Sequence, residues 1–188
     1  EEPCYAVTCP ADAVLEGEPA LYDGYDDEYN SGCNGDLGNY QVIDWTNDED
    51  GLPPYDGCAL LCGNSGWHLG PLGEEFRDTD WFIATALTTG YMDFTVESLY
   101  PCYIYQLVPS PMDCALVDAA LAATAECGSP ATLSIPVVAG QVVYLWVGPT
   151  TYTGPVLEFP YSMSVCNNEF SSVSNEDMNW GQGKTLFK

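Results

Sequence analysis

The chain has 188 residues, enough for one well-buried core. Its 28 acidic residues stand against three Lys or Arg, a net charge of −25. Nucleic acid is therefore excluded as a partner and anionic lipid is disfavoured, because no basic surface is available to contact phosphates. A hydrophobic content of 46% argues against disorder, and no apolar run is long enough to cross a membrane as a helix.

Nine cysteines are far more than an ordinary intracellular chain carries, and their spacing does not suit a zinc site. Cys4 and Cys9 have four residues between them, Cys58 and Cys62 have three, and His68 is the single histidine. Disulfide bonds formed in an oxidising compartment are the better explanation.

The cysteine spacing does not fix which residues are paired, and our guess is Cys33 with Cys62 and Cys114 with Cys127. Because nine is odd, we expect at least one thiol that is free or bonded to another chain. The first residues lack the charged and apolar regions of a signal peptide. We therefore expect a mature chain whose signal has been removed, located outside a bacterial cell or on its surface.

Residues 1–80 hold 19 of the 28 acids and are rich in Gly, Asp, Asn and Pro. They predict an N-terminal segment at 1–13, followed by loops and short strands such as the one at Tyr40–Ile43. We expect disulfides to hold these loops in place.

From Asp80 onward, apolar and polar residues alternate as in half-buried strands. Asp113–Glu126 is Ala-rich and could form a helix, but we favour a strand because cysteines lie near both of its ends. Regularly spaced strands separated by turns predict an all-β sandwich or barrel. The expected strands are Trp81–Leu87, Tyr91–Glu97, Tyr103–Val108, Ala131–Val137, Gln141–Val147 and Tyr161–Val165.

Four motifs occur in an order that resembles the bacterial pre-peptidase C-terminal domain family. They are Glu16–Pro19, Asp78–Phe82, Ala139–Val147 and Tyr161–Val165. The resemblance covers residues 14–166, with a cysteine-rich insertion at about 30–66 and a C-terminal tail at 167–188. It implies a secreted jelly-roll β-sandwich, often attached to an exported enzyme. The family includes collagen-binding modules with a calcium site that joins the acidic segment to the Asp-x-Asp segment.

The same resemblance places a calcium site at Glu16, Glu18, Asp78 and Asp80, although Ala20-Leu21 replaces the usual Asn-Asp after Pro19. A calcium ion takes six to eight oxygen ligands, and extracellular modules bind it at about 10⁻⁴–10⁻³ M. We expect Arg77 to form a salt bridge that orients the Asp-x-Asp segment.

Two further acidic loops offer carboxylates for a calcium ion. The turn-prone stretch Asp23–Asn30 includes Asp23 and Asp27 as additional candidates. Asn47–Gly51 resembles a short calcium loop without the distal Glu of an EF-hand, so we favour a solvated loop there.

Aromatic residues divide into expected core and expected contact positions. Trp67, Trp81 and Trp146 lie in strand-like contexts and are predicted to be buried. The tyrosines of the acidic half are either core residues or exposed platforms. At the C-terminus, the candidates for contact with a partner are Trp180, Leu186 and Phe187.

The sequence contains no G-x-S-x-G, H-E-x-x-H or P-loop motif, so we expect no enzyme. The favoured function is a secreted calcium-binding structural or adhesive protein. Its tail would pair with the sheet edge of a second copy and build a homopolymeric filament or surface layer. The alternative is a carbohydrate- or matrix-protein-binding module, which predicts a row of exposed aromatics on one sheet face. An enzyme domain using a pair of acids is the third.

Overall fold

The computed structural model describes residues 6–34, 39–45 and 58–169, and these contain strands but no helix. In this part of the chain, no helix capable of spanning a membrane occurs. The strands are β1 Val14–Leu15, β2 Gln41–Val42, β3 Cys58–Leu69, β4 Glu75–Arg77, β5 Asp80–Thr85, β6 Gly90–Ser98, β7 Cys102–Val108, β8 Asp118–Ala125, β9 Ala131–Val137, β10 Val142–Pro149 and β11 Leu157–Glu169.

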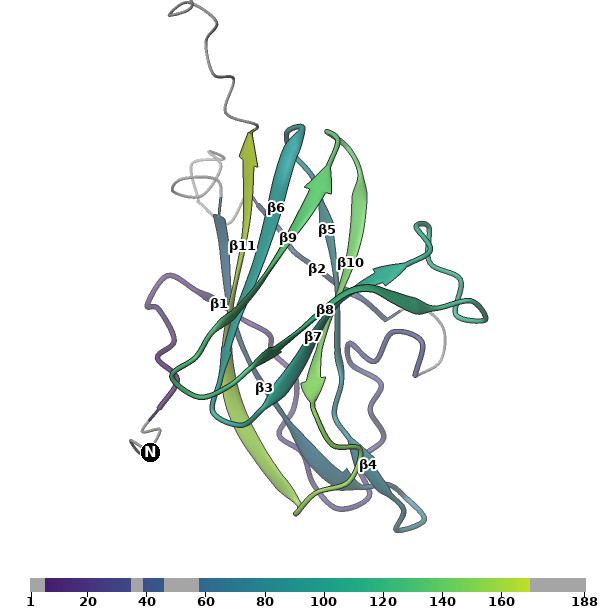
Figure 1. Cartoon of the computed structure of the whole chain (residues 1–188). Coiled ribbons are helices and arrows are strands. Elements are labelled where there is room, and N and C mark those ends of the chain that lie inside the picture. The colour runs from purple at the N-terminus through teal and green to yellow at the C-terminus, as the bar shows by residue number, and fades with distance from the viewer. Residues whose placement is uncertain (1–5, 35–38, 46–57, 170–188) are drawn as a thin grey trace, which may run out of the picture.

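Two sheets pack face to face (Figure 1). The first has the order β1-β3-β11-β6-β9, with β4 also paired to β3, and the second has the order β2-β5-β10-β7-β8. The eight longer strands are divided between the sheets in the orders 3-11-6-9 and 5-10-7-8, and neighbouring strands are antiparallel. This is the jelly-roll topology, so the expected all-β jelly-roll sandwich is confirmed.

The core lies between the sheets and follows the period of two that the sequence displays. Along β9, for example, Leu133, Ile135 and Val137 face inward and the residues between them are exposed. Asp113–Glu126 contains β8, as favoured over a helix. The largest fully buried core side chains are Tyr161, Phe82, Phe94, Phe159, Met92 and Ile104.

β3 is the one long strand that the sequence pattern did not predict. β2 and most of β3 lie in the stretch 30–66 set aside as an insertion, so that stretch contributes strands to both sheets. The segment Gly63–Gly66 interrupts the apolar alternation. A Cβ at position 63 would collide with the carboxylate of Glu16 and the ring of Tyr161, so the glycine is required by what lies against the strand.

The guessed disulfide pairs are wrong. Cys62 bonds to Cys9, Cys33 bonds to Cys114, and Cys58 bonds to Cys166, while Cys127 is also disulfide-bonded. The guess joined cysteines that lie close in sequence, whereas the sandwich brings together strands that lie far apart. The Cys58–Cys166 bond, for instance, joins residues directly opposite each other on β3 and β11.

Among the cysteines that the structure describes, the free one is Cys102, and it is fully buried in the core. Burial raises the pKa of its thiol to about 12, and Ser98 lies within hydrogen-bond distance of the sulfur. Cys102 therefore cannot bond to another chain while the domain is folded, and the odd cysteine is no argument for assembly.

The three tryptophans expected in the core are buried. Trp67 belongs to the main core between the sheets, whereas Trp81 and Trp146 lie in a second apolar cluster with Tyr144 and Leu107. Tyr40 packs edge-on against Trp81 and Tyr144.

Candidate metal centre

Carboxylates from three chain segments, at residues 16–18, 27 and 78–80, lie together. Glu16 directly follows β1, and its backbone N–H donates to the carbonyl of Cys62 at 2.8 Å, which continues the parallel pairing of β1 with β3. Asp80 begins β5 and Asp78 precedes it, with the Asp78 N–H donating to the carbonyl of Gly66 at 2.9 Å. Backbone pairing thus fixes both acidic segments.

Gly17 makes the turn between Glu16 and Glu18. Its φ of 84° lies in the left-handed region, which glycine adopts without strain. A side chain there would also press on the hydroxyl of Tyr29, 3.0 Å from the added Cβ. The two glutamates therefore reach one cluster through a left-handed glycine and not through simple alternation along an extended strand.

Asn30 connects the two acidic segments and was not among the sequence candidates. Its Nδ2 donates to Oε1 of Glu16 at 2.6 Å and to Oδ1 of Asp80 at 2.9 Å. Its carbonyl accepts from the N–H of Trp81 at 2.9 Å, which ties the loop to the start of β5. One buried amide therefore holds two carboxylates that belong to distant parts of the chain.

Several buried oxygens of this region have no hydrogen-bond partner in the part of the chain that the structure describes. Buried polar atoms normally have partners, so their concentration in one place requires an explanation. Asp78, Asp80 and Asn30 are themselves almost completely buried. The unpartnered oxygens are Glu18 Oε2, Asp27 Oδ1, Asn30 Oδ1, Asp78 Oδ1, Asp80 Oδ2 and the Tyr161 hydroxyl.

The carboxylates form two overlapping triads. Glu16, Glu18 and Asp80 make one, and Glu18, Asp27 and Asp78 make the other, with ligand atoms within 4.8 Å of one another in each. Glu18 belongs to both. The geometry joins Asp27 to the site that the resemblance placed at Glu16, Glu18, Asp78 and Asp80.

Burial and crowding make these carboxylates resist ionisation. The pKa of Glu18 is raised from 4.5 to about 8, mainly by desolvation and also by the neighbouring Glu16 and Asp27, against a lowering hydrogen bond from Tyr25. Desolvation likewise raises the pKa of Asp27 to about 6.

The pKa values of Asp78 and Asp80 also rise well above their ordinary range, first through complete burial and then through neighbouring carboxylates. The cluster therefore needs positive charge, either as protons or as a cation.

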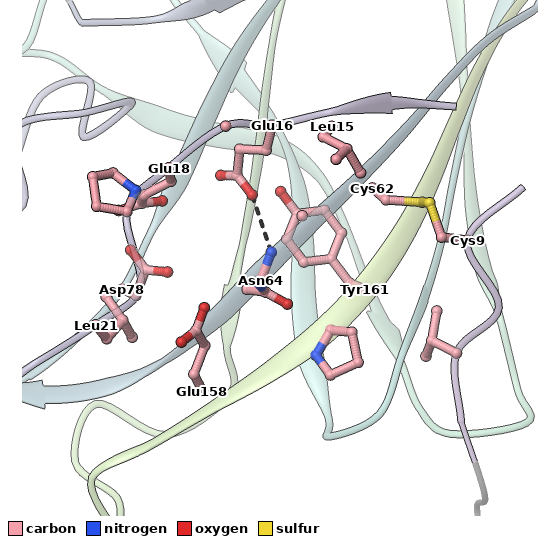
Figure 2. Close-up of a pocket in the computed structure, with 15 residues that line it drawn as sticks. Cys9, Leu15, Glu16, Glu18, Leu21, Cys62, Asn64, Asp78, Glu158 and Tyr161 are labelled. Atoms are coloured by element: carbon pink, nitrogen blue, oxygen red, sulfur yellow. Dashed lines mark hydrogen bonds between the residues drawn. A yellow bond between two sulfur atoms is a disulfide. The ribbon is translucent and has the colours of Figure 1, made fainter. Parts of the chain in front are cut away.

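A pocket of about 310 Å³ leads to the carboxylates. Figure 2 shows Glu16, Glu18 and Asp78 along one side of it, with Asn64 donating its backbone N–H to Glu16 at 3.0 Å. The Cys9–Cys62 disulfide lies at the other end of the same view. A small ion can thus reach side chains that are otherwise buried.

Other candidates from the sequence lie elsewhere. Asp23 is exposed and belongs to neither triad. Arg77 does not pair with Asp78; its guanidinium lies 5.0 Å over the ring of Trp146 and donates to the carbonyl of Pro149 at 2.9 Å. Asn47–Gly51, Trp180, Leu186 and Phe187 lie outside the described residues.

No protein-family model and no curated protein matches the sequence. Among solved structures, the chain is similar to PliG of Aeromonas hydrophila, a periplasmic inhibitor of g-type lysozyme, with 13% identity and a TM-score of 0.41. The match covers 68% of this chain and 94% of that one. This similarity is too distant to assign a function.

Proposed function

We propose that this chain is a secreted, non-enzymatic, calcium-binding structural or adhesive protein, related to the pre-peptidase C-terminal domains and assembling with copies of itself. The observation that carries the calcium part is the convergence of unpartnered, buried carboxylate oxygens from Glu18, Asp78 and Asp80 on one place. The disulfide bonds support an oxidising, extracellular location. The jelly-roll topology agrees with what the family resemblance implies.

Calcium fits this donor set better than other biological cations. The groups that converge are oxygens only, and no cysteine or histidine belongs to either triad, which disfavours zinc. Calcium accepts irregular arrangements of six to eight oxygens, whereas magnesium requires near-ideal octahedral geometry. Ligands that come from a left-handed glycine turn, a loop and a strand end make an irregular set.

Calorimetric titration of the calcium-free protein with calcium and with magnesium tests the site. We expect calcium binding at about 10⁻⁴–10⁻³ M and a rise in melting temperature with calcium concentration, since a ligand of the native state stabilises it. Asp23→Asn, an exposed change in the same acidic region, serves as the control and should bind normally. A melting temperature that calcium does not alter would refute the proposal.

Self-association is supported by the free edge of the second sheet. Among the described strands β8 pairs only with β7, and its residues Asp118–Ala122 are exposed. Ala119–Ala125 carries no charge on a chain with a net charge of −25. Edge strands of sheets usually carry charged residues or proline, which prevent another strand from pairing with them. A neutral edge strand can pair with a strand of a second copy without bringing acidic side chains together.

Sedimentation velocity and negative-stain microscopy at increasing concentration, with calcium present, test this assembly. Leu121→Lys places a charge on the 38%-exposed Leu121 of β8 and should prevent association. Leu72→Lys, in the turn between β3 and β4, is the matched control because Leu72 is 91% exposed. Monomers at every concentration, or equal disruption by both variants, would contradict the proposal.

A further inference from the structure

A second pocket, of about 220 Å³, lies beside the carboxylate cluster and is not explained by metal binding. The β3–β4 hairpin supplies His68, Phe76 and Arg77, and the strand pairing places His68 opposite Phe76. The stretch between β1 and β2 supplies Tyr25 and Asn34, and the connection between β10 and β11 supplies Tyr152.

Four aromatic rings contribute to its walls. His68 stacks on Phe76 with ring centroids 6.0 Å apart, Tyr25 meets His68 edge-on at 5.3 Å, and Tyr152 meets Phe76 edge-on at 6.4 Å. Tyr152 is 57% exposed, so part of its ring is open to solvent. The partly buried Phe76 and the exposed Tyr152 therefore offer ring surface to a ligand.

The lining also contains both hydrogen-bond donors and hydrogen-bond acceptors. Arg77 is fixed by its stacking over Trp146 and Tyr152 and by its bond to Pro149, which leaves further N–H donors on the guanidinium. His68 is 3% exposed, and its Nδ1 has no hydrogen-bond partner in the described part of the chain. Oδ1 of Asp27, another lining residue, is also unpartnered.

We propose that this pocket binds a sugar ring of a neutral glycan, with the ring face against the aromatic wall and hydroxyl groups on Arg77, His68 and Asp27. A hydroxyl both donates and accepts, so it matches a set that mixes a guanidinium, an imidazole and a carboxylate. An anionic glycan is disfavoured by the net charge of −25 and by Asp26 and Asp27 in the lining.

His68 gives a site-specific readout because it is the single histidine of the chain. The full-length protein is titrated with gluco-, manno-, galacto- and chito-oligosaccharides while the imidazole resonances are followed by NMR. At least one neutral oligosaccharide should bind saturably and shift them. A panel that shifts none of them overturns the proposal, and so does a shift produced only by anionic oligogalacturonate.

Substitution then locates the site. Tyr152→Ala should weaken binding of the responding sugar about tenfold, because one stacking surface is lost. Tyr91→Ala is the matched control, since Tyr91 is an exposed tyrosine of β6 that does not line the pocket. Equal effects of the two variants overturn the placement.

The titration is made with calcium and again after its removal, because Asp27 belongs both to this pocket and to a carboxylate triad. Binding under either condition supports the pocket, whether or not the carboxylates bind calcium. The inference therefore stands independently of the proposed metal site.

Discussion

Asn30 and Asp80 lie fifty residues apart in the sequence and are joined by a buried hydrogen bond of 2.9 Å. The same Asn30 nitrogen donates to Glu16, so a single neutral amide holds together two carboxylates that would otherwise repel each other. Its own oxygen has no partner in the described residues and adds to the acceptors of the cluster. The cluster is thus arranged for a cation by a residue that carries no charge.

Replacing Asn30 by Ala should destabilise the protein by about 1.5–3 kcal/mol, because buried hydrogen bonds to charged groups contribute this much and their loss leaves the carboxylates unpaired. Urea unfolding in the presence of calcium measures the change. Asn168→Ala is the control, since Asn168 makes an exposed hydrogen bond to Asp93 and should cost far less. Equal losses in the two variants would contradict the role given to Asn30.

Asp80→Asn should change stability in opposite directions with and without calcium. Without calcium, the substitution removes a fully buried carboxylate that lies close to Glu16 and Asp78, so the melting temperature should rise. In calcium, the variant lacks the negative charge of one carboxylate ligand. Calcium should therefore raise its melting temperature much less than it raises that of the unaltered protein.

Thermal unfolding of both proteins in calcium and in chelator makes this comparison, with Asp23→Asn as the control for general loss of negative charge. If Asp80→Asn responded to calcium as strongly as the unaltered protein, Asp80 would not be a ligand.

The calcium-free protein should lose stability as the pH rises. The pKa of Asp27 is raised from 3.8 to about 6 and that of Glu18 from 4.5 to about 8, so over this range the folded state holds protons that the unfolded chain has released. The free energy of unfolding is therefore largest at a pH below the ordinary pKa values of these two groups, and it falls as the pH rises to about 8.

Bound calcium replaces those protons, so the fall should be absent at saturating calcium. Melting temperatures measured across this pH range, with and without the ion, check both halves. If the stability of the calcium-free protein instead rose with pH between the raised pKa of Asp27 and the raised pKa of Glu18, the carboxylates would not be crowded as described.

The sequence predicted those parts of the fold that depend on a local pattern. β9 lies at Ala131–Val137 as expected, since alternation along it is regular. β3 was missed because Gly63 within it is explained only by Glu16 and Tyr161, which pack against the strand from elsewhere in the chain.

The same division holds for the candidate site. Glu16, Glu18, Asp78 and Asp80 were grouped through the family resemblance, and the fold brings them together. Asn30 has no local pattern that marks it, because its partners are fixed by the pairing of distant segments. Asp23 and Asp27 look alike in sequence, and only the course of the loop exposes one and turns the other toward Glu18.

The Cys33–Cys114 disulfide should contribute to stability. It should also hold the loop around Cys33, between β1 and β2, over the outer face of the second sheet. The bond closes a long stretch of chain, 81 residues in sequence, and Cys33 packs against the cluster that contains Trp81 and Tyr144. Replacing both cysteines by serine should lower the free energy of unfolding by about 2–4 kcal/mol, mainly through the unfolded chain.

The same variant should expose Trp81 and Trp146, which lie in that cluster, and so shift tryptophan emission to longer wavelength before global unfolding. Cys102→Ser in the main core is the contrasting variant: it should lower stability without such an early shift, because Cys102 lies between the sheets. Emission that changed only together with global unfolding in both variants would mean that the loop is held over the tryptophans by other contacts.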